Sequence, residues 1–178
     1  MGATPPPCPC CSALPPPPEL PANEAVYSAP GIWKTDEGRE VSLKTLAGRP
    51  QVVAFFFTSC HVTCPVTVQN LAGVAAKAGA SKRFGFVLVT MDPYTDTAAV
   101  LASFRKDHRM GSDWTLLRGE SDATQALAKK LGITYRIDHS VLRHSPGIVV
   151  LDRGGKVAGS FTGLYPDIAA IAALANRL

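Results

Sequence analysis

Two cysteines, Cys60 and Cys64, are the residues whose type and spacing most directly predict chemistry in this sequence. They follow the apolar run 51–58 and precede Pro65, a residue that suits the first turn of a helix. A helix N-terminus stabilises thiolate, so we expect lowered thiol pKa values and sulfurs that act as nucleophiles or metal ligands. A two-residue gap would indicate a thioredoxin-type redox pair. The three-residue gap lets both sulfurs converge on one ion, and two soft sulfurs favour copper(I).

A third ligand has to come from one of the four histidines. An imidazole would complete a trigonal copper site, whereas a closed structural zinc site needs four ligands and only three strong ones are found. His61 lies inside the cysteine loop, with a side chain expected to point outward. His139 and His144 lie in a predicted loop before the strand 147–151. His108 lies in a charged stretch typical of a solvated helix end. From the residues alone, His61, His139 and His144 all remain candidates for the third ligand.

Residues 1–30 differ in composition from the rest of the chain, because they hold ten of its fifteen prolines. Such a segment favours an extended polyproline conformation, so we interpret it as a flexible tail or tether preceding one folded domain, 31–178. Cys8, Cys10 and Cys11 lie in this tail. Three thiols within four residues can wrap a soft ion. The other two interpretations are a lipid-attachment point and an incidental, easily oxidised segment.

The elements that must position the cysteines alternate along the predicted domain. Continuous apolar runs indicate strands buried on both faces, and amphipathic stretches between them indicate helices. This order predicts an α/β, thioredoxin-like fold with a mostly parallel central sheet flanked by helices and an N-terminal hairpin. Chemistry in such sheets gathers beyond the carboxyl ends of the strands. The expected elements are hairpins over 31–42 and 147–161, strands at 51–58, 84–91 and 114–118, and helices at 65–80, 96–110, 120–131 and 166–178.

Charge and hydropathy exclude other classes of function. A net charge of +4 without a basic run or interleaved aromatics argues against a nucleic-acid partner. The longest apolar run, 52–57, is too short to span a bilayer, and no secretory apolar segment precedes a cleavage site. Five cysteines cannot all pair within one chain, so their clustering indicates metal or redox chemistry rather than structural disulfides.

Three motifs follow one another along the predicted domain. They are an apolar strand running into Cys60-x-x-x-Cys64-Pro65, then Asp92-Pro93 with Asp96-Thr97, and His144-Ser145 eight residues before Asp152. By these motifs the chain from residue 31 onward resembles the Sco (SenC) copper proteins of cytochrome c oxidase assembly. The resemblance implies a thioredoxin-like fold and copper, as Cu(I) or Cu(II), bound by Cys60, Cys64 and His144. It selects His144 over His139 because of the spacing to the following hairpin, and the family's loop usually has Pro-Asp where this chain has His61 and Val62.

The resemblance further implies a non-enzymatic metallochaperone that delivers copper to the CuA centre of cytochrome c oxidase. Its partners would be the CuA subunit or another copper acceptor, and a periplasmic copper donor or thiol reductant. It would act in the periplasm, or facing it from a membrane anchor in the full-length precursor. The alternative is a thiol-disulfide oxidoreductase that cycles Cys60 and Cys64 and reduces the cysteines of a copper acceptor. A peroxidase-like thiol enzyme fits the residues less well.

Overall fold

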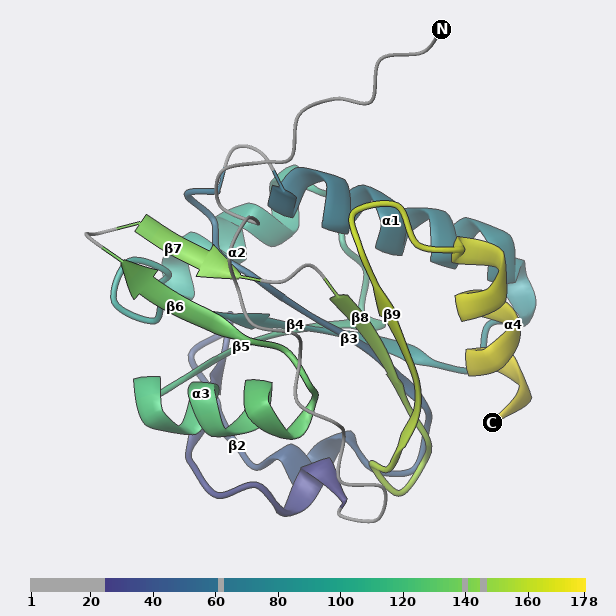
Figure 1. Cartoon of the computed structure of the whole chain (residues 1–178), viewed down its shortest axis with the longest axis horizontal. Helices are drawn as coiled ribbons and strands as arrows, with labels where there is room; N and C mark the ends of the chain where they lie inside the picture. The colour runs from purple at the N-terminus through teal and green to yellow at the C-terminus, as the bar shows by residue number, and fades with distance from the viewer. Residues whose placement is uncertain (1–24, 61–62, 139–140, 145–146) are drawn as a thin grey trace, which may run out of the picture.

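The computed structural model describes residues 25–60, 63–138, 141–144 and 147–178, with the backbone alone described for 136–138 and 141–144. Over these ranges the chain builds one seven-stranded sheet with helices on both faces (Figure 1). The strand order in this sheet is β2-β1-β5-β4-β3-β8-β9. The strands are β1 (Trp33–Thr35), β2 (Glu40–Val41), β3 (Gln51–Phe56), β4 (Gly85–Thr90), β5 (Trp114–Gly119), β8 (Gly147–Leu151) and β9 (Val157–Thr162).

The three central strands β5, β4 and β3 are parallel, and every residue of β3 and β4 is buried. Burial on both faces is why these strands read as continuous apolar runs in the sequence. β8 joins β3, and β1 joins β5, in the antiparallel sense. The predicted α/β class is confirmed: the three predicted central strands are parallel, and the two predicted hairpins extend the sheet on both sides.

Alternate residues of each central strand face different helices, since side chains alternate across a sheet. In β3, Phe56 belongs to the apolar cluster beneath α1, α2 and α4, whereas Phe55 belongs to the cluster beneath α3. Figure 1 shows α1 and α4 on one side of the sheet and α3 on the other. The four predicted helices are confirmed, with ends shifted by a few residues: α1 (Thr63–Ala78), α2 (Ala98–Asp107), α3 (Ser121–Lys130) and α4 (Ile168–Arg177).

The folded part of the chain begins before residue 31, the boundary predicted from composition. Val26 and Tyr27 are buried in a short 3-10 helix, Val26–Ser28, within the cluster beneath α3. The Val26 N–H donates to the carbonyl oxygen of Gly155 at 2.8 Å. An apolar pair at the end of a proline-rich segment therefore fastens the chain to the β8–β9 turn. The predicted tail up to residue 24 lies outside the described residues.

A second, two-stranded sheet occupies the segment for which the sequence predicted a loop. β6 (Tyr135–Asp138) and β7 (Val141–His144) pair antiparallel, with Tyr135 opposite His144 and Asp138 opposite Val141. The prediction missed this ribbon because each strand has only four residues and charged residues interrupt the apolar pattern. His144 therefore ends a strand, three residues before β8. None of the described helices combines the length and apolar character needed to cross a bilayer.

Replacing Gly155 with alanine is expected to lower the free energy of unfolding by roughly 2–4 kcal/mol. Gly155 has a φ of +84°, and an added Cβ would lie 2.4 Å from Cδ2 of Tyr27. The matched control is Gly38→Ala, with a φ of +78° and no described atom within 4 Å, which should cost about 1 kcal/mol. Urea denaturation of both variants measures the difference. Equal losses would show that Tyr27 does not constrain the β8–β9 turn.

Candidate metal centre

The two cysteines lie where β3 gives way to α1, beyond the carboxyl end of a central parallel strand. The Cys60 N–H donates to the Phe57 carbonyl at 3.2 Å, which closes a tight turn directly after β3. Cys64 is the second residue of α1 and is 2 % exposed, whereas Cys60 is half-buried. One sulfur is thus close to the surface of the loop and the other lies beneath it.

Both residues carry thiols, and the first turn of α1 holds the Cys60 sulfur in place. The Cys64 N–H donates to Cys60 Sγ at 3.4 Å, and the Thr63 hydroxyl lies 3.2 Å from the same sulfur. The first N–H groups of a helix have no partner within the helix, so a sulfur placed there satisfies one of them. The structure therefore brings Cys60 and Cys64 together, as the sequence predicted.

The expectation of lowered thiol pKa values is wrong for Cys64. A hydrogen bond with Cys60 raises the pKa of the Cys64 thiol well above its ordinary value, and burial raises it further. Burial excludes the water that would otherwise solvate a thiolate. The sequence could place Cys64 at a helix N-terminus but could not show that Val68 and Leu71, one and two turns later, enclose it in the core.

A buried carboxylate fixes the segment that leads into the cysteine loop. Asp96 is 0 % exposed and accepts the Thr58 N–H at 3.1 Å, and it also accepts the hydroxyl groups of Thr58 and Thr90. The ion pairs found among the described residues do not include Asp96. Because a buried carboxylate is costly unless its oxygens are hydrogen-bonded, these neutral donors hold it in place. Asp96 thereby joins the carboxyl ends of β3 and β4.

Asp96 is among the residues that carry the family resemblance, but the resemblance alone gives it no structural role. The signal was present in the strands, since Thr58 and Thr90 are polar residues at the ends of two apolar runs. The carboxyl ends of neighbouring parallel strands lie at one edge of the sheet, so their side chains can share a partner. A carboxylate six residues after Thr90 is close enough along the chain to be that partner.

The predicted third ligand is placed only through its backbone. His144 ends β7 opposite Tyr135, and its side chain lies outside the described part of the structure, as do His61 and His139. His108 is exposed after α2 with its ring 4.2 Å from that of Phe104, consistent with the predicted solvated helix end. Among the side chains that are described, no group of three His, Cys, Asp or Glu residues is arranged to hold a metal. The assignment of His144 therefore stays a prediction.

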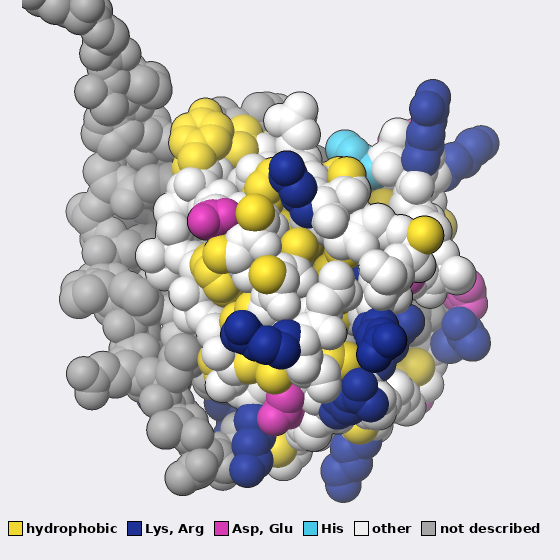
Figure 2. All heavy atoms as spheres, turned by 90° about the vertical axis from the view of Figure 1, so that its right-hand side faces the viewer, with side chains coloured by type: hydrophobic (Ala, Val, Ile, Leu, Met, Phe, Trp, Pro, Cys, Tyr) yellow, Lys and Arg dark blue, Asp and Glu magenta, His cyan; other side chains and the backbone are white. Residues whose placement is uncertain are grey.

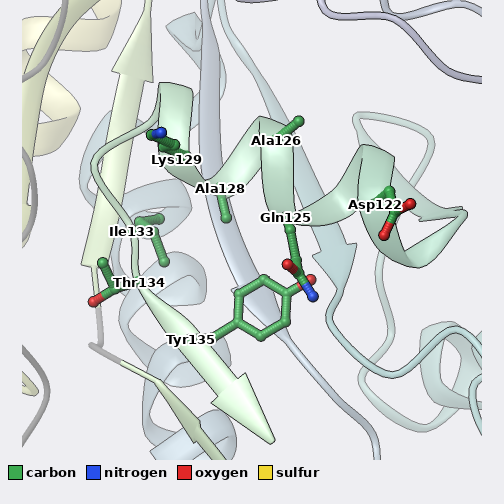
Figure 3. Close-up of a pocket in the computed structure, with 8 residues that line it drawn as sticks. All are labelled: Asp122, Gln125, Ala126, Ala128, Lys129, Ile133, Thr134 and Tyr135. Carbon is green, nitrogen blue, oxygen red and sulfur yellow. The ribbon is translucent and has the colours of Figure 1, made fainter.

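A pocket of about 530 Å³ separates α3 from the start of the β6–β7 ribbon. Figure 3 shows the Tyr135 ring lying beneath α3, beside Gln125. The Tyr135 hydroxyl has no hydrogen-bond partner among the described atoms, and burial raises the pKa of Tyr135 to about 12. The hydroxyl therefore stays protonated at neutral pH. The strand that faces His144 is anchored in this way by an aromatic ring packed under a helix.

The structure has a dithiol at the start of the helix that follows a central strand, and helices cover both faces of the sheet. This combination defines a thioredoxin-like thiol protein. The sequence model of the SCO1/SenC family matches residues 33–178, and the chain belongs to that family.

Relatives in sequence and structure agree with this membership. The chain is 26% identical over 149 residues to a SCO1 protein homolog of Bacillus subtilis (strain 168), covering 78% of this chain and 77% of the relative. A SCO1/SenC family lipoprotein from Bacillus anthracis superposes with a TM-score of 0.76 at 24% identity, covering 83% of this chain and 91% of that one. Arabidopsis thaliana ScoI, solved with copper bound, gives 0.73 at 19%, covering 85% and 96%. The structural likenesses establish the thioredoxin-like fold.

Asp96→Asn is expected to lower the free energy of unfolding by about 1–3 kcal/mol, because an amide nitrogen would replace an acceptor oxygen opposite buried donors. It should also speed alkylation of the buried Cys64, since the loop would open more often. Asp107→Asn, an exposed change at the end of α2, should stay within about 0.5 kcal/mol of the parent. Urea denaturation and thiol alkylation test this pair. Parent-like stability and alkylation in Asp96→Asn would contradict the role assigned to the carboxylate.

Proposed function

We propose that this protein is a copper metallochaperone that holds copper with Cys60, Cys64 and His144 and delivers it to the CuA centre of cytochrome c oxidase. The observation that carries the proposal is the placing of the two cysteines at the start of α1, where the backbone N–H of Cys64 donates to Cys60 Sγ at 3.4 Å. Membership of the SCO1/SenC family supports copper as the cargo.

The chemistry of the donors fits a soft cation. Two sulfurs suit copper(I), and an added imidazole extends the tolerance to copper(II). The half-buried position of Cys60 gives an incoming ion a sulfur to meet first, and Cys64 is buried at the second residue of α1. The Asp96 contacts fix Thr58, two residues before Cys60, which supports a loop that is partly ordered before an ion arrives. Pre-organisation of this kind lowers the entropic cost of binding.

The backbone supports His144 as the third ligand. Ile148 of β8 pairs with Ala54 of β3, two residues before the end of that strand. Because β8 runs antiparallel to β3, the residues just before β8 lie at the edge where β3 ends and the cysteine loop begins. His144 is three residues before Gly147, the first residue of β8. The family resemblance assigns the metal imidazole to this same position.

The setting we propose is outside the cytoplasm, in the periplasm or on a membrane that faces it. The Bacillus anthracis relative is a lipoprotein, which supports attachment of this domain through the segment before residue 25. The partners would be a copper donor or thiol reductant and the CuA subunit or another copper acceptor. Cys8, Cys10 and Cys11, outside the described residues, would be an auxiliary copper(I) site or a point of attachment.

Copper titration of the reduced protein is expected to show one strong site in the folded domain. Cys60→Ser and Cys64→Ser should each abolish strong binding, and His144→Ala should abolish the visible absorption of the copper(II) form, because each removes one of three ligands. His139→Ala is the matched control and should bind as the parent does. Absorption spectroscopy and metal analysis give the readout, with thiol titration confirming that both cysteines stay reduced.

The same series separates the two functions considered from the sequence. Loss of copper binding in His144→Ala with unchanged thiol exchange supports the chaperone, because disulfide exchange needs no imidazole ligand. Parent-like copper binding in His144→Ala, together with loss of binding in His139→Ala or His61→Ala, would identify His139 or His61 as the third ligand instead. Parent-like binding in all three variants would leave a dithiol protein and favour the oxidoreductase.

Delivery is a separate expectation. Copper-loaded protein mixed with a purified, reduced, soluble CuA domain should transfer its metal, and the purple CuA absorption should appear. Transfer should fail when the loaded protein is replaced by His144→Ala treated in the same way, because that variant carries little copper. Strong copper binding by the parent without any transfer would contradict the delivery step. It would not affect the assignment of the copper site.

A further inference from the structure

Exposed cations gather at the end of the sheet opposite the cysteine loop, where β3 and β4 begin. Figure 2 faces this end of the molecule and shows many dark blue side chains over it and few magenta ones. The cations come from the 3-10 helix before β3, the last turns of α1 and α4, the approach to β4 and the β8–β9 turn. We call this surface the basic pole, and its exposed members are Lys44, Arg49, Lys77, Arg83, Arg153, Lys156 and Arg177.

Contacts between these segments show that the cations are neighbours. The Gly48 N–H donates to the carbonyl of Arg153 at 3.0 Å, and the Arg153 guanidinium donates to the main-chain oxygen of Leu178 at 2.9 Å. On the other side of α4, the Arg83 N–H donates to the Asn176 side chain at 3.3 Å. Segments far apart in the sequence thus converge at one end of the sheet and bring their charges together.

The seven cations of the basic pole outnumber the acidic side chains that lie among them. None of the seven cations forms an ion pair with a described acidic residue. Asp113 pairs with Lys82 beside the pole, and Asp152 accepts the backbone N–H groups of Gly154 and Lys156 at 2.9 Å. A cluster of unpaired cations raises a positive potential that attracts an anionic surface.

The composition of the pole favours a membrane over a protein partner. The centres of protein interfaces are enriched in Trp, Tyr and Arg, and of these the described part of the pole exposes arginine without an aromatic residue. The large exposed apolar residues of the described chain are Ile32, Tyr94, Val100 and Tyr165. They lie before β1, after β4, at the start of α2 and after β9, which are all at the cysteine end of the sheet. The basic pole therefore exposes cations without large apolar side chains among its described residues. This composition suits electrostatic adsorption to anionic lipid.

The N-terminal segment joins the fold at the same pole. Val26 hydrogen-bonds Gly155 in the β8–β9 turn, between Arg153 and Lys156. If residues before 25 attach the domain to a membrane, which rests on the proposed function, the attached segment leaves the described domain at this pole. β3 spans about 20 Å from this pole to the cysteine loop.

We propose that the basic pole adsorbs electrostatically to anionic phospholipid membranes and holds the domain with its Cys60–Cys64 loop directed away from the bilayer. The full chain should float with vesicles of phosphatidylcholine and phosphatidylglycerol in equal parts, and not with phosphatidylcholine alone. Binding should weaken strongly between about 0.1 M and about 1 M salt, because the Debye length falls from roughly 10 Å to 3 Å.

Two double variants locate the surface. Arg83→Gln with Lys156→Gln should weaken vesicle binding roughly ten- to thirtyfold, since each cation contributes separately. The matched control also removes one arginine and one lysine, by Arg118→Gln and Lys34→Gln on the paired strands β5 and β1, and should change binding less than about threefold. Equal losses in both variants would overturn the proposal. So would binding to polyglutamate without binding to vesicles, which would make the partner an acidic polypeptide.

Footprinting tests the orientation. On anionic vesicles, Lys77 and Lys156 should be protected from a water-soluble amine reagent, whereas Lys34 should react as it does in solution. Cys60 should keep its solution rate of alkylation, and its protection would overturn the orientation. Copper titration of both double variants should match the parent, so that failure of the lipid surface and failure of the copper site are recorded separately.

Discussion

The carboxylate of Asp96 is the constraint on which the geometry of the cysteine loop depends. Burying a charge without a counter-charge is costly, and here the cost is offset by the Thr58 N–H and two threonine hydroxyls. Those donors lie at the ends of β3 and β4, so the carboxylate joins two strands and the loop that leaves one of them. The thiols are consequently presented by the most deeply buried part of the sheet, and a change at Asp96 reaches them without touching sulfur.

The sequence predicted the parts of the fold that depend on long, regular apolar patterns. The runs of β3 and β4 and the four helices are confirmed because their burial is nearly complete or strictly periodic. The cysteine loop was also predicted, since Pro65 marks a helix start. The β6–β7 ribbon was missed because short, charged strands resemble loops. The burial of Val26 and the raised pKa of Cys64 were missed because both follow from tertiary contacts rather than from local pattern.

The domain has two ends of opposite character. Strands β3 and β4 finish at the cysteine loop, the Asp96 cluster and the exposed Tyr94, whereas the same strands begin beside the N-terminal 3-10 helix and the basic pole. The parallel centre of the sheet produces this division, because it sends every strand-to-helix loop to one end and every helix-to-strand loop to the other. Residues at the cysteine end and residues at the basic pole can therefore change independently in this fold.

Strands β6 and β7 form a two-stranded sheet of their own beside the seven-stranded sheet. In the part of the chain that the structure describes, this ribbon is hydrogen-bonded within itself and not to the seven-stranded sheet. A two-stranded ribbon is marginal on its own and can move at far lower cost than a central strand. His144 therefore ends a strand whose backbone partner is β6, and β6 in turn packs on the fold through Tyr135 beneath α3. The end of β7 can shift relative to the seven-stranded sheet without breaking any strand pairing of that sheet.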